Sequence, residues 1–299
     1  MKIYENIESE RERIQNCIQK YGWTSDHNLD WFVYGKIKKD GIPTFVEFDD
    51  MSGLLVHRYS NEWRIWSDPL CNKENASEKI SEFSQYAFKE GVGRVWCDDV
   101  SDVIYPELIK NNYLKIEDIY YSLSWPILNM ETYDLNLPGG NLKEIRNARN
   151  KFYREHTLKS VDSIEFDKKN LHEIVENWKK AISAKEDIYD LKYHNAIENN
   201  FKGFITARVL VVDGNPVGFN AGYEVPNNPS RFAGVIGIHD YSIKDLGVIS
   251  WLEDLEWIKK HNYKEVDLQG TENNQELKFK MQFGPIIERK TDCFSIIRR

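Results

Sequence analysis

Apolar positions along the chain follow two periods, which separate predicted helices from predicted strands. Near the N-terminus, Ile7, Ile14 and Ile18 recur at spacings of seven and four, so residues 4–21 are predicted to form an amphipathic helix. A second helix is predicted over residues 75–90. Between the two helices the pattern changes to short apolar runs separated by turn residues, which is typical of strands.

Residues 31–67 are therefore predicted to be rich in strands. The stretch WFVYGKIKKDGIPTFVEF is predicted to form a hairpin with Asp40-Gly41 at its turn, and LLVHRYS and EWRIWSD follow as two more short strands. After the helix that ends at Gly91, the run RVWCDDV predicts another strand. One more helix and one more strand complete a first half of mixed α and β structure.

The second half repeats this order of elements. Asp213-Gly214 supplies the tight turn of its clearest hairpin. The pattern predicts helices over 141–156, 168–184, 190–200 and 246–262, and strands over 160–166, FITARVLVVD, PVGFNAGYEV, RFAGVIGIHDY, 265–269 and IERKTDCFSIIRR.

The break around Asp134 to Gly140, DLNLPGG, is the predicted domain boundary. The predicted domains are residues 1–133 and residues 134–299, and both halves have helices first, then an antiparallel meander, a helix, a strand, a helix and a strand. The predicted fold class is α/β (α+β), with two tandem domains, each a mainly antiparallel mixed sheet flanked by helices.

Composition and charge limit the classes of function that the protein can have. The formal net charge is −8, so an anion-binding site has to be a local patch rather than a generally basic surface. The cysteines are far apart and form no CxxC or Cys/His cluster, so no metal site is predicted; they are Cys17, Cys71, Cys97 and Cys293. The charged N-terminus lacks the apolar segment of a signal peptide, and no apolar run is as long as a membrane span, which together predict a cytoplasmic protein.

Four motifs resemble a known group of enzymes. The run VLVVDGNPVGFNAGYEV resembles the central hairpin of the GNAT-type acyltransferase fold. The runs WSDPLCNKENASEKISEFSQYAF, GGNLKEIRNARNKF and VDLQGTENNQELKFKMQFGP are similar, in order and spacing, to the C-terminal domain family of phosphatidylglycerol lysyltransferases. That family is in turn similar to the FemABX aminoacyltransferases. The resemblance covers most of the chain and is weakest over residues 1–60.

The resemblance implies two tandem GNAT-like domains, with the active cleft in the second. It implies an aminoacyl- or acyltransferase that moves a group from a phosphate-bearing carrier, aminoacyl-tRNA or acyl-CoA, to an amine or hydroxyl on a lipid headgroup, a peptide or a small molecule. No tightly bound cofactor is expected. The alternatives are a CoA-dependent N-acyltransferase and a catalytically silent module that binds tRNA or a lipid headgroup.

Two lysines lie within the last predicted helix, between apolar residues. Lys278 and Lys280 alternate with Phe279 in LKFKMQF, and the plain interpretation of Lys280 is a side chain that extends from a half-buried helix into solvent. The resemblance assigns the lysine of the Phe-Lys motif to Lys280, whose ammonium would stabilise charge on the scissile carbonyl or the departing carrier. Lys278 is expected to face solvent.

The predicted helix 141–156 is locally basic. Arg146, Arg149, Asn150 and Arg154 follow a near-helical spacing, and guanidinium groups suit phosphate because they donate two hydrogen bonds in a fixed geometry. This spacing is compatible both with carrier binding and with simple solvation of a charged helix face. The resemblance matches Arg146 and Asn150 to family positions.

Further candidates follow the two strands that would border the cleft. Gly270 and Asn273, in the turn before the last helix, are added to the predicted carrier-binding residues. His239 and Asp240 end a predicted strand and are candidate catalytic bases, although Asp240 also suits a turn cap. The sequence departs from the family at Ser250, where the lysyltransferases have an acidic residue, which leaves the identity of the transferred group open.

Overall fold

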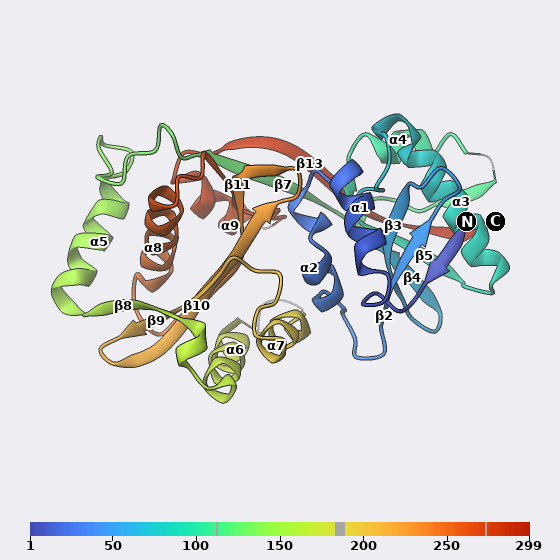
Figure 1. Ribbon diagram of the computed structural model, residues 1–299. Coiled ribbons are helices and arrows are strands. Elements are labelled where there is room, and N and C mark those ends of the chain that lie inside the picture. The colour runs from blue at the N-terminus through green and yellow to red at the C-terminus, as the bar shows by residue number, and fades with distance from the viewer. Residues whose placement is uncertain (112, 183–188, 273) are drawn as a thin grey trace. The chain divides into compact units, whose positions relative to one another are not determined.

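The structure is a computed structural model that describes residues 1–111, 113–182, 189–272 and 274–299. Contacts divide the chain into two compact units (Figure 1). Unit 1 consists of Met1–Trp125, Gly270–Leu277 and Ile287–Arg299, and unit 2 consists of Pro126–Gln269 and Lys278–Ile286.

Unit 1 has a mixed sheet in the order β1-β2-β3-β4-β5-β13, which the first half of β7 continues. Here β4 and β5 pair in parallel, whereas β1–β2, β2–β3, β3–β4, β5–β13 and β6–β13 pair antiparallel. Its elements begin with β1 (Lys2–Tyr4), α1 (Arg11–Tyr21), η1 (Ser25–His27), α2 (Leu29–Tyr34), β2 (Ile42–Glu47), β3 (Gly53–Arg58) and β4 (Glu62–Ile65). They continue with η2 (Lys73–Asn75), α3 (Ala76–Lys89), β5 (Arg94–Ser101), α4 (Ile104–Leu108), β6 (Leu114–Ile116), the first half of β7 (Tyr121–Asn129) and most of β13 (Ile286–Arg298).

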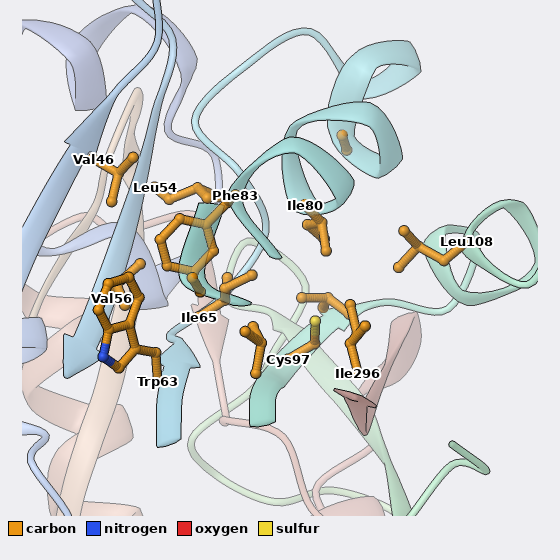
Figure 2. Close-up of a cluster of buried hydrophobic side chains, with 14 of the residues drawn as sticks. Val46, Leu54, Val56, Trp63, Ile65, Ile80, Phe83, Cys97, Leu108 and Ile296 are labelled. Carbon is orange, nitrogen blue, oxygen red and sulfur yellow. The ribbon is translucent and has the colours of Figure 1, made fainter. Parts of the chain in front are cut away.

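The sheet of unit 1 has an apolar core on each face because successive strand residues point to opposite sides. Phe45 and Leu55 pack with the helices α1 and α2, whereas their neighbours Val46 and Leu54 pack with α3. Figure 2 shows this second core, where Phe83 of α3 lies among strand side chains and Ile296 of β13 joins them.

The predicted hairpin around Asp40-Gly41 is wrong. The run WFVY belongs to the helix α2, which begins because the Asn28 side chain accepts a hydrogen bond from the Trp31 amide at 2.9 Å. The hairpin is formed instead by β2 and β3. A short apolar run with buried residues on several sides has no clear period, so the sequence pattern alone does not separate a buried helix from a strand.

Unit 2 repeats the pairing pattern of unit 1. Its strands lie in the order β7-β12-β11-β10-β9-β8, and among the pairings of the described residues β11–β12 is the parallel one. Its elements are α5 (Lys143–Glu155), β8 (Leu158–Asp162), η3 (Ser163–Glu165), α6 (Lys168–Ile182), α7 (Leu191–Glu198), β9 (Thr206–Val212), β10 (Asn215–Val225), β11 (Asn228–His239), α8 (Leu246–Lys260), β12 (Glu265–Asp267) and the end of α9 (Asn274–Met281).

Helices cover both faces of the unit 2 sheet. The helices α5 and α8 lie on one face, and α6 and α7 lie on the other (Figure 1). The predicted turn Asp213-Gly214 joins β9 to β10 with positive φ at both residues, 51° and 85°, which is the backbone that tight hairpins require. The predicted fold class, two tandem mixed sheets that are mainly antiparallel and flanked by helices, is confirmed.

Each sheet receives its last strand from the other half of the sequence. The strand β13, at the C-terminus, pairs with β5 in unit 1, and the second half of β7 pairs with β12 in unit 2. The units therefore differ from the contiguous predicted domains, 1–133 and 134–299. The physical reason is burial, because Phe294 and Ile296 of β13 are fully buried in the core of unit 1.

Candidate functional site

The candidate site lies where the short strand β12 of unit 2 ends. The strands β11 and β12 pair in parallel only over Arg231–Ala233 and Glu265–Asp267, and β11 then continues to His239. An irregularity in the pairing of β10 with β11, next to Gly222, directly follows this short stretch. The backbone beyond Asp267 is therefore no longer held by β11, although the Leu268 amide still donates to the Pro126 carbonyl oxygen of β7 at 3.1 Å.

Two buried charged side chains fix the backbone of Gln269. The Gln269 amide donates to Oδ1 of Asp267 at 2.8 Å, and Nζ of Lys280 donates to the Gln269 carbonyl oxygen at 3.0 Å. Both side chains belong to residues that are only 3% exposed. Gln269 has a φ of 65°, in the left-handed region that a glutamine rarely adopts. Such backbone is held only where its surroundings determine it, and it is enriched at functional sites.

The helix α9 places its two lysines differently. Lys278 is exposed, as expected, whereas Lys280 is buried, so the interpretation of Lys280 as a side chain extending into solvent does not hold. The ring of Phe283 stacks on Trp251 of α8 at 5.4 Å, which anchors the end of α9 in the core of unit 2. The ammonium of Lys280 is thus a fixed positive charge beside Gln269.

Gly270 has a packing role in unit 1. A Cβ atom at this position would lie 2.7 Å from Cε2 of Trp125, so only glycine allows the close approach. The next residue, Thr271, forms a β-bridge with Ser124 and donates its hydroxyl to Glu276 at 2.9 Å. Asn273, the other predicted carrier-binding residue of this turn, lies outside the described residues.

His239 and Asp240 follow β11 well beyond the paired stretch. His239 lies six positions after Ala233, the last residue of β11 that pairs with β12. Burial lowers the pKa of His239, and its ring lies so close to Gly247 of α8 that a Cβ there would be 2.9 Å from Nε2. Oδ1 of Asp240 accepts from the Ser242 amide at 2.8 Å, which is the turn-capping role.

The basic helix α5 does not direct its arginines toward one point. Nη1 of Arg146 donates to the carbonyl oxygens of Leu137 and Gly139, and Nη1 of Arg149 donates to that of Leu135 at 2.7 Å. These two arginines therefore hold the loop that precedes α5. Asn150 and Arg154 are exposed on the helix surface, and they are the members of the predicted set that can meet a ligand directly.

The sequence pattern does not reveal an ion pair in unit 2 between the buried Arg208 and the half-buried Asp254. Arg208 of β9 donates to the carboxylate of Asp254 on α8, and its guanidinium lies 5.0 Å from the centre of the Trp257 ring. Burial raises the pKa of Asp254 to about 6, although Arg208 acts in the opposite direction. Gly234 of β11 faces this carboxylate, since a Cβ there would lie 3.3 Å from Oδ2. The available signal was an arginine within the apolar run ARVLVV.

Ser250 does not replace the family's acidic residue with another charge. Its hydroxyl donates to Oδ1 of Asn220 at 2.8 Å, and Nδ2 of Asn220 donates to the Ser250 carbonyl oxygen at 2.9 Å. Both residues are buried, so they join α8 to β10 and are satisfied by each other. A ligand amine would find no carboxylate at this position.

The repeated sheet topology, with one parallel pair in each unit, defines a tandem GNAT-like fold. Solved structures share it at low sequence identity. The C-terminal DUF2156 domain of a putative lysylphosphatidylglycerol synthetase from Agrobacterium fabrum matches with a TM-score of 0.68 and 13% identity, over 98% of this chain and 92% of that one. FemX matches with a TM-score of 0.62 and 12% identity, over 99% and 97% of the two chains.

A tandem GNAT protein from the clavulanic acid biosynthesis pathway matches with a TM-score of 0.57 and 10% identity, over 98% and 97% of the two chains. These findings confirm the resemblance to the lysyltransferase and FemABX groups at the level of the fold. No protein-family model and no curated protein matches the sequence. Among the described residues, no helix has both the length and the apolar character to cross a bilayer.

Proposed function

We propose that the protein is an aminoacyl- or acyltransferase that uses a phosphate-bearing carrier as donor. One observation carries this proposal, namely the buried ammonium of Lys280 held beside the left-handed Gln269 at the end of β12. A charge whose position is fixed in advance can stabilise charge that develops on a substrate without further reorganisation. The tandem GNAT-like fold, which the lysylphosphatidylglycerol synthetase and FemX structures share, supports the same class of reaction.

In the proposed reaction, an amine or hydroxyl of the acceptor attacks the carbonyl carbon of the donor. A new bond forms to that carbon, the bond to the carrier breaks, and the acceptor proton leaves with the carrier or with solvent. Lys280 stabilises the negative charge that develops on the carbonyl oxygen or on the carrier, because its position is fixed before the substrate arrives. We do not assign the acceptor proton to His239 or Asp240, because Asp240 caps a turn and the ring of His239 packs against Gly247.

The carrier is proposed to be an aminoacyl-tRNA or an acyl-CoA, and the exposed basic face of α5 is its proposed contact. Arg154 and Asn150 contribute directly to this face, whereas Arg146 and Arg149 contribute charge while they hold the preceding loop. Phosphate contacts of exposed basic residues weaken as salt rises, because counterions are released on binding.

The test is turnover with a panel of aminoacyl-tRNAs and acyl-CoAs, using amines and lipid headgroups as acceptors. The variant Lys280→Met removes the charge with little change in volume, and the matched control Lys278→Met removes the exposed neighbouring charge. We expect Lys280→Met to lower kcat by about a hundredfold, as removal of one fixed donor typically does. Lys278→Met should retain near wild-type kcat.

Three outcomes decide the proposal. Turnover that Lys280→Met abolishes and Lys278→Met preserves supports it. If a donor raises the melting temperature but no acceptor is converted, the protein is a binding module rather than an enzyme. Equal turnover in the two variants removes Lys280 from the mechanism, and a lowered melting temperature of Lys280→Met alone would then assign it to holding Gln269.

A further inference from the structure

A second cluster of ionisable side chains lies on helices α6 and α7 of unit 2. The segments HEIVE on α6 and DLKYH at the start of α7 each place a histidine and a carboxylate four residues apart. Nε2 of His194 lies 3.3 Å from Oε1 of Glu176 and 3.4 Å from Oδ2 of Asp190. One ligand atom from each of these three residues lies within 4.8 Å of the others.

The proton positions follow from the hydrogen bonds of the neighbouring histidine. Nδ1 of His172 lies 2.7 Å from Nδ1 of His194, and Nε2 of His172 lies 2.7 Å from Oε1 of Glu198. With two neutral rings, only one arrangement places a proton in each short contact. His194 donates from Nδ1 to His172, and His172 donates from Nε2 to the carboxylate of Glu198.

This arrangement leaves Nε2 of His194 with an unprotonated lone pair that faces two carboxylates. A cation placed between these three atoms would be attracted to all of them, although Oδ2 of Asp190 also has the ammonium of Lys179 at 2.7 Å. A tetrahedral zinc ion with bonds of about 2.0–2.1 Å separates its ligand atoms by about 3.4 Å.

We propose that Glu176, Asp190 and His194 form a binding site for a divalent transition-metal ion of the zinc type. Imidazole together with carboxylates suits zinc rather than magnesium or calcium, which prefer oxygen alone. His172 and Glu198 orient the ligand His194, which is the common arrangement around metal-bound histidines. The ion would join α6 to α7 and retain one coordination position for water.

Two lysines lie beside residues of this site, and the cysteine thiols are the other groups that could compete for the metal ion. Nζ of Lys179 lies 2.7 Å from Oδ2 of Asp190, and Lys168 lies 3.5 Å from Oε2 of Glu198. Lys179 competes with the ion for Asp190, so Lys179→Gln is expected to strengthen metal binding. The four cysteines are buried, and burial raises the pKa of both Cys17 and Cys71 to about 12, so these thiols do not compete for zinc.

The experiment is calorimetric titration of the full chain with Zn²⁺, together with Co²⁺ absorption as a probe of geometry. We expect one equivalent to bind, with a tetrahedral Co²⁺ spectrum that lacks a thiolate band. His194→Gln should weaken binding at least about a hundredfold, and His172→Gln should weaken it about tenfold to a hundredfold. The control is His156→Gln, because His156 contacts a single carboxylate, that of Asp213, at 2.7 Å.

Unchanged binding in His156→Gln, together with loss in His194→Gln, supports the site. Absence of Zn²⁺ binding overturns it, as does equal affinity in the three histidine variants. Wild-type affinity in His172→Gln contradicts the role of His172 in orienting the ligand His194. Circular dichroism of each metal-free variant, which should match the wild type, shows that any loss comes from the ligand set rather than from unfolding.

Discussion

Unit 1 should lose stability in mild acid because of a buried histidine on β3. His57 is 2% exposed, stacks on the ring of Phe32 at 4.6 Å and donates from Nε2 to the Phe32 carbonyl oxygen at 2.9 Å. A carbonyl only accepts, so Nε2 carries the proton of a neutral imidazole. Burial, the largest cause, lowers the pKa of His57 from 6.5 to about 3.

The sign and size of the effect follow from linkage. The unfolded chain takes up a proton at His57 below pH 6.5, whereas the folded chain does so only near pH 3, so stability falls as pH decreases between these values. At pH 5 the protonated form of His57 exceeds the neutral form about thirtyfold in the unfolded chain, whereas His57 of the folded chain stays neutral. The expected loss between pH 8 and pH 5 is therefore about 2 kcal/mol from His57 alone.

The measurement is the free energy of unfolding in urea at pH 8 and pH 5 for the wild type and for His57→Gln. Glutamine keeps a donor for the Phe32 carbonyl oxygen but does not titrate, so the variant should lose about 2 kcal/mol of the pH dependence whatever its stability at pH 8. The raised pKa of Asp254 acts with the opposite sign in both proteins and cancels in the difference. The same pH dependence in wild type and variant would refute the reasoning.

Three more predictions test the fold and the site. Arg149→Ala should lower the free energy of unfolding by about 1.5–3 kcal/mol because it removes a charged hydrogen bond to the Leu135 carbonyl oxygen. Arg154→Ala should leave stability unchanged and reduce the salt dependence of carrier binding. Equal effects of the two variants on stability would contradict this difference in role. Gly270→Ala should cost about 1–3 kcal/mol in a urea titration because its methyl group meets Trp125, and a neutral result would show that the ring moves freely. A fragment of residues 1–133 should show no cooperative thermal transition because it lacks β13, and a sharp transition would show that the core of unit 1 closes without Phe294 and Ile296.

The sequence predicts those parts of the fold that depend on local period and turn chemistry. The helices α5, α6 and α8 and the hairpin of β9 and β10 follow directly from apolar spacing and from Asp213-Gly214, whose left-handed backbone a short turn needs. The run WFVY in α2 has no usable period, because Trp31, Phe32 and Tyr34 are all buried. Its helical state depends on the Asn28 cap and on packing.

The sequence predicts which residue types belong to the candidate site, but not whether each side chain is buried or what it contacts. Period alone leaves Lys278 and Lys280 alike, since each lies next to Phe279, and only the packing of α9 buries one and exposes the other. The arginines of α5 show the same limit. A guanidinium donates equally well to a phosphate and to a carbonyl oxygen, so the spacing of Arg146 and Arg149 could not reveal that the loop before α5 supplies the acceptors.

The exchange of last strands explains why the sequence predicts individual strands but does not predict which strand each one pairs with. A strand is recognised from its own residues, and β13 was predicted as a strand for that reason, but its partner is chosen by the edge and the core that it completes. In unit 1 that core requires Ile296, and in unit 2 the edge of β12 pairs with Ile127 and Leu128 of β7. The chain that leaves β12 has to turn sharply at Gln269, and this turn is where Asp267 and Lys280 are buried. The fixed charge on which the proposed chemistry depends is thus a consequence of how β12 ends, which no local pattern in the sequence specifies.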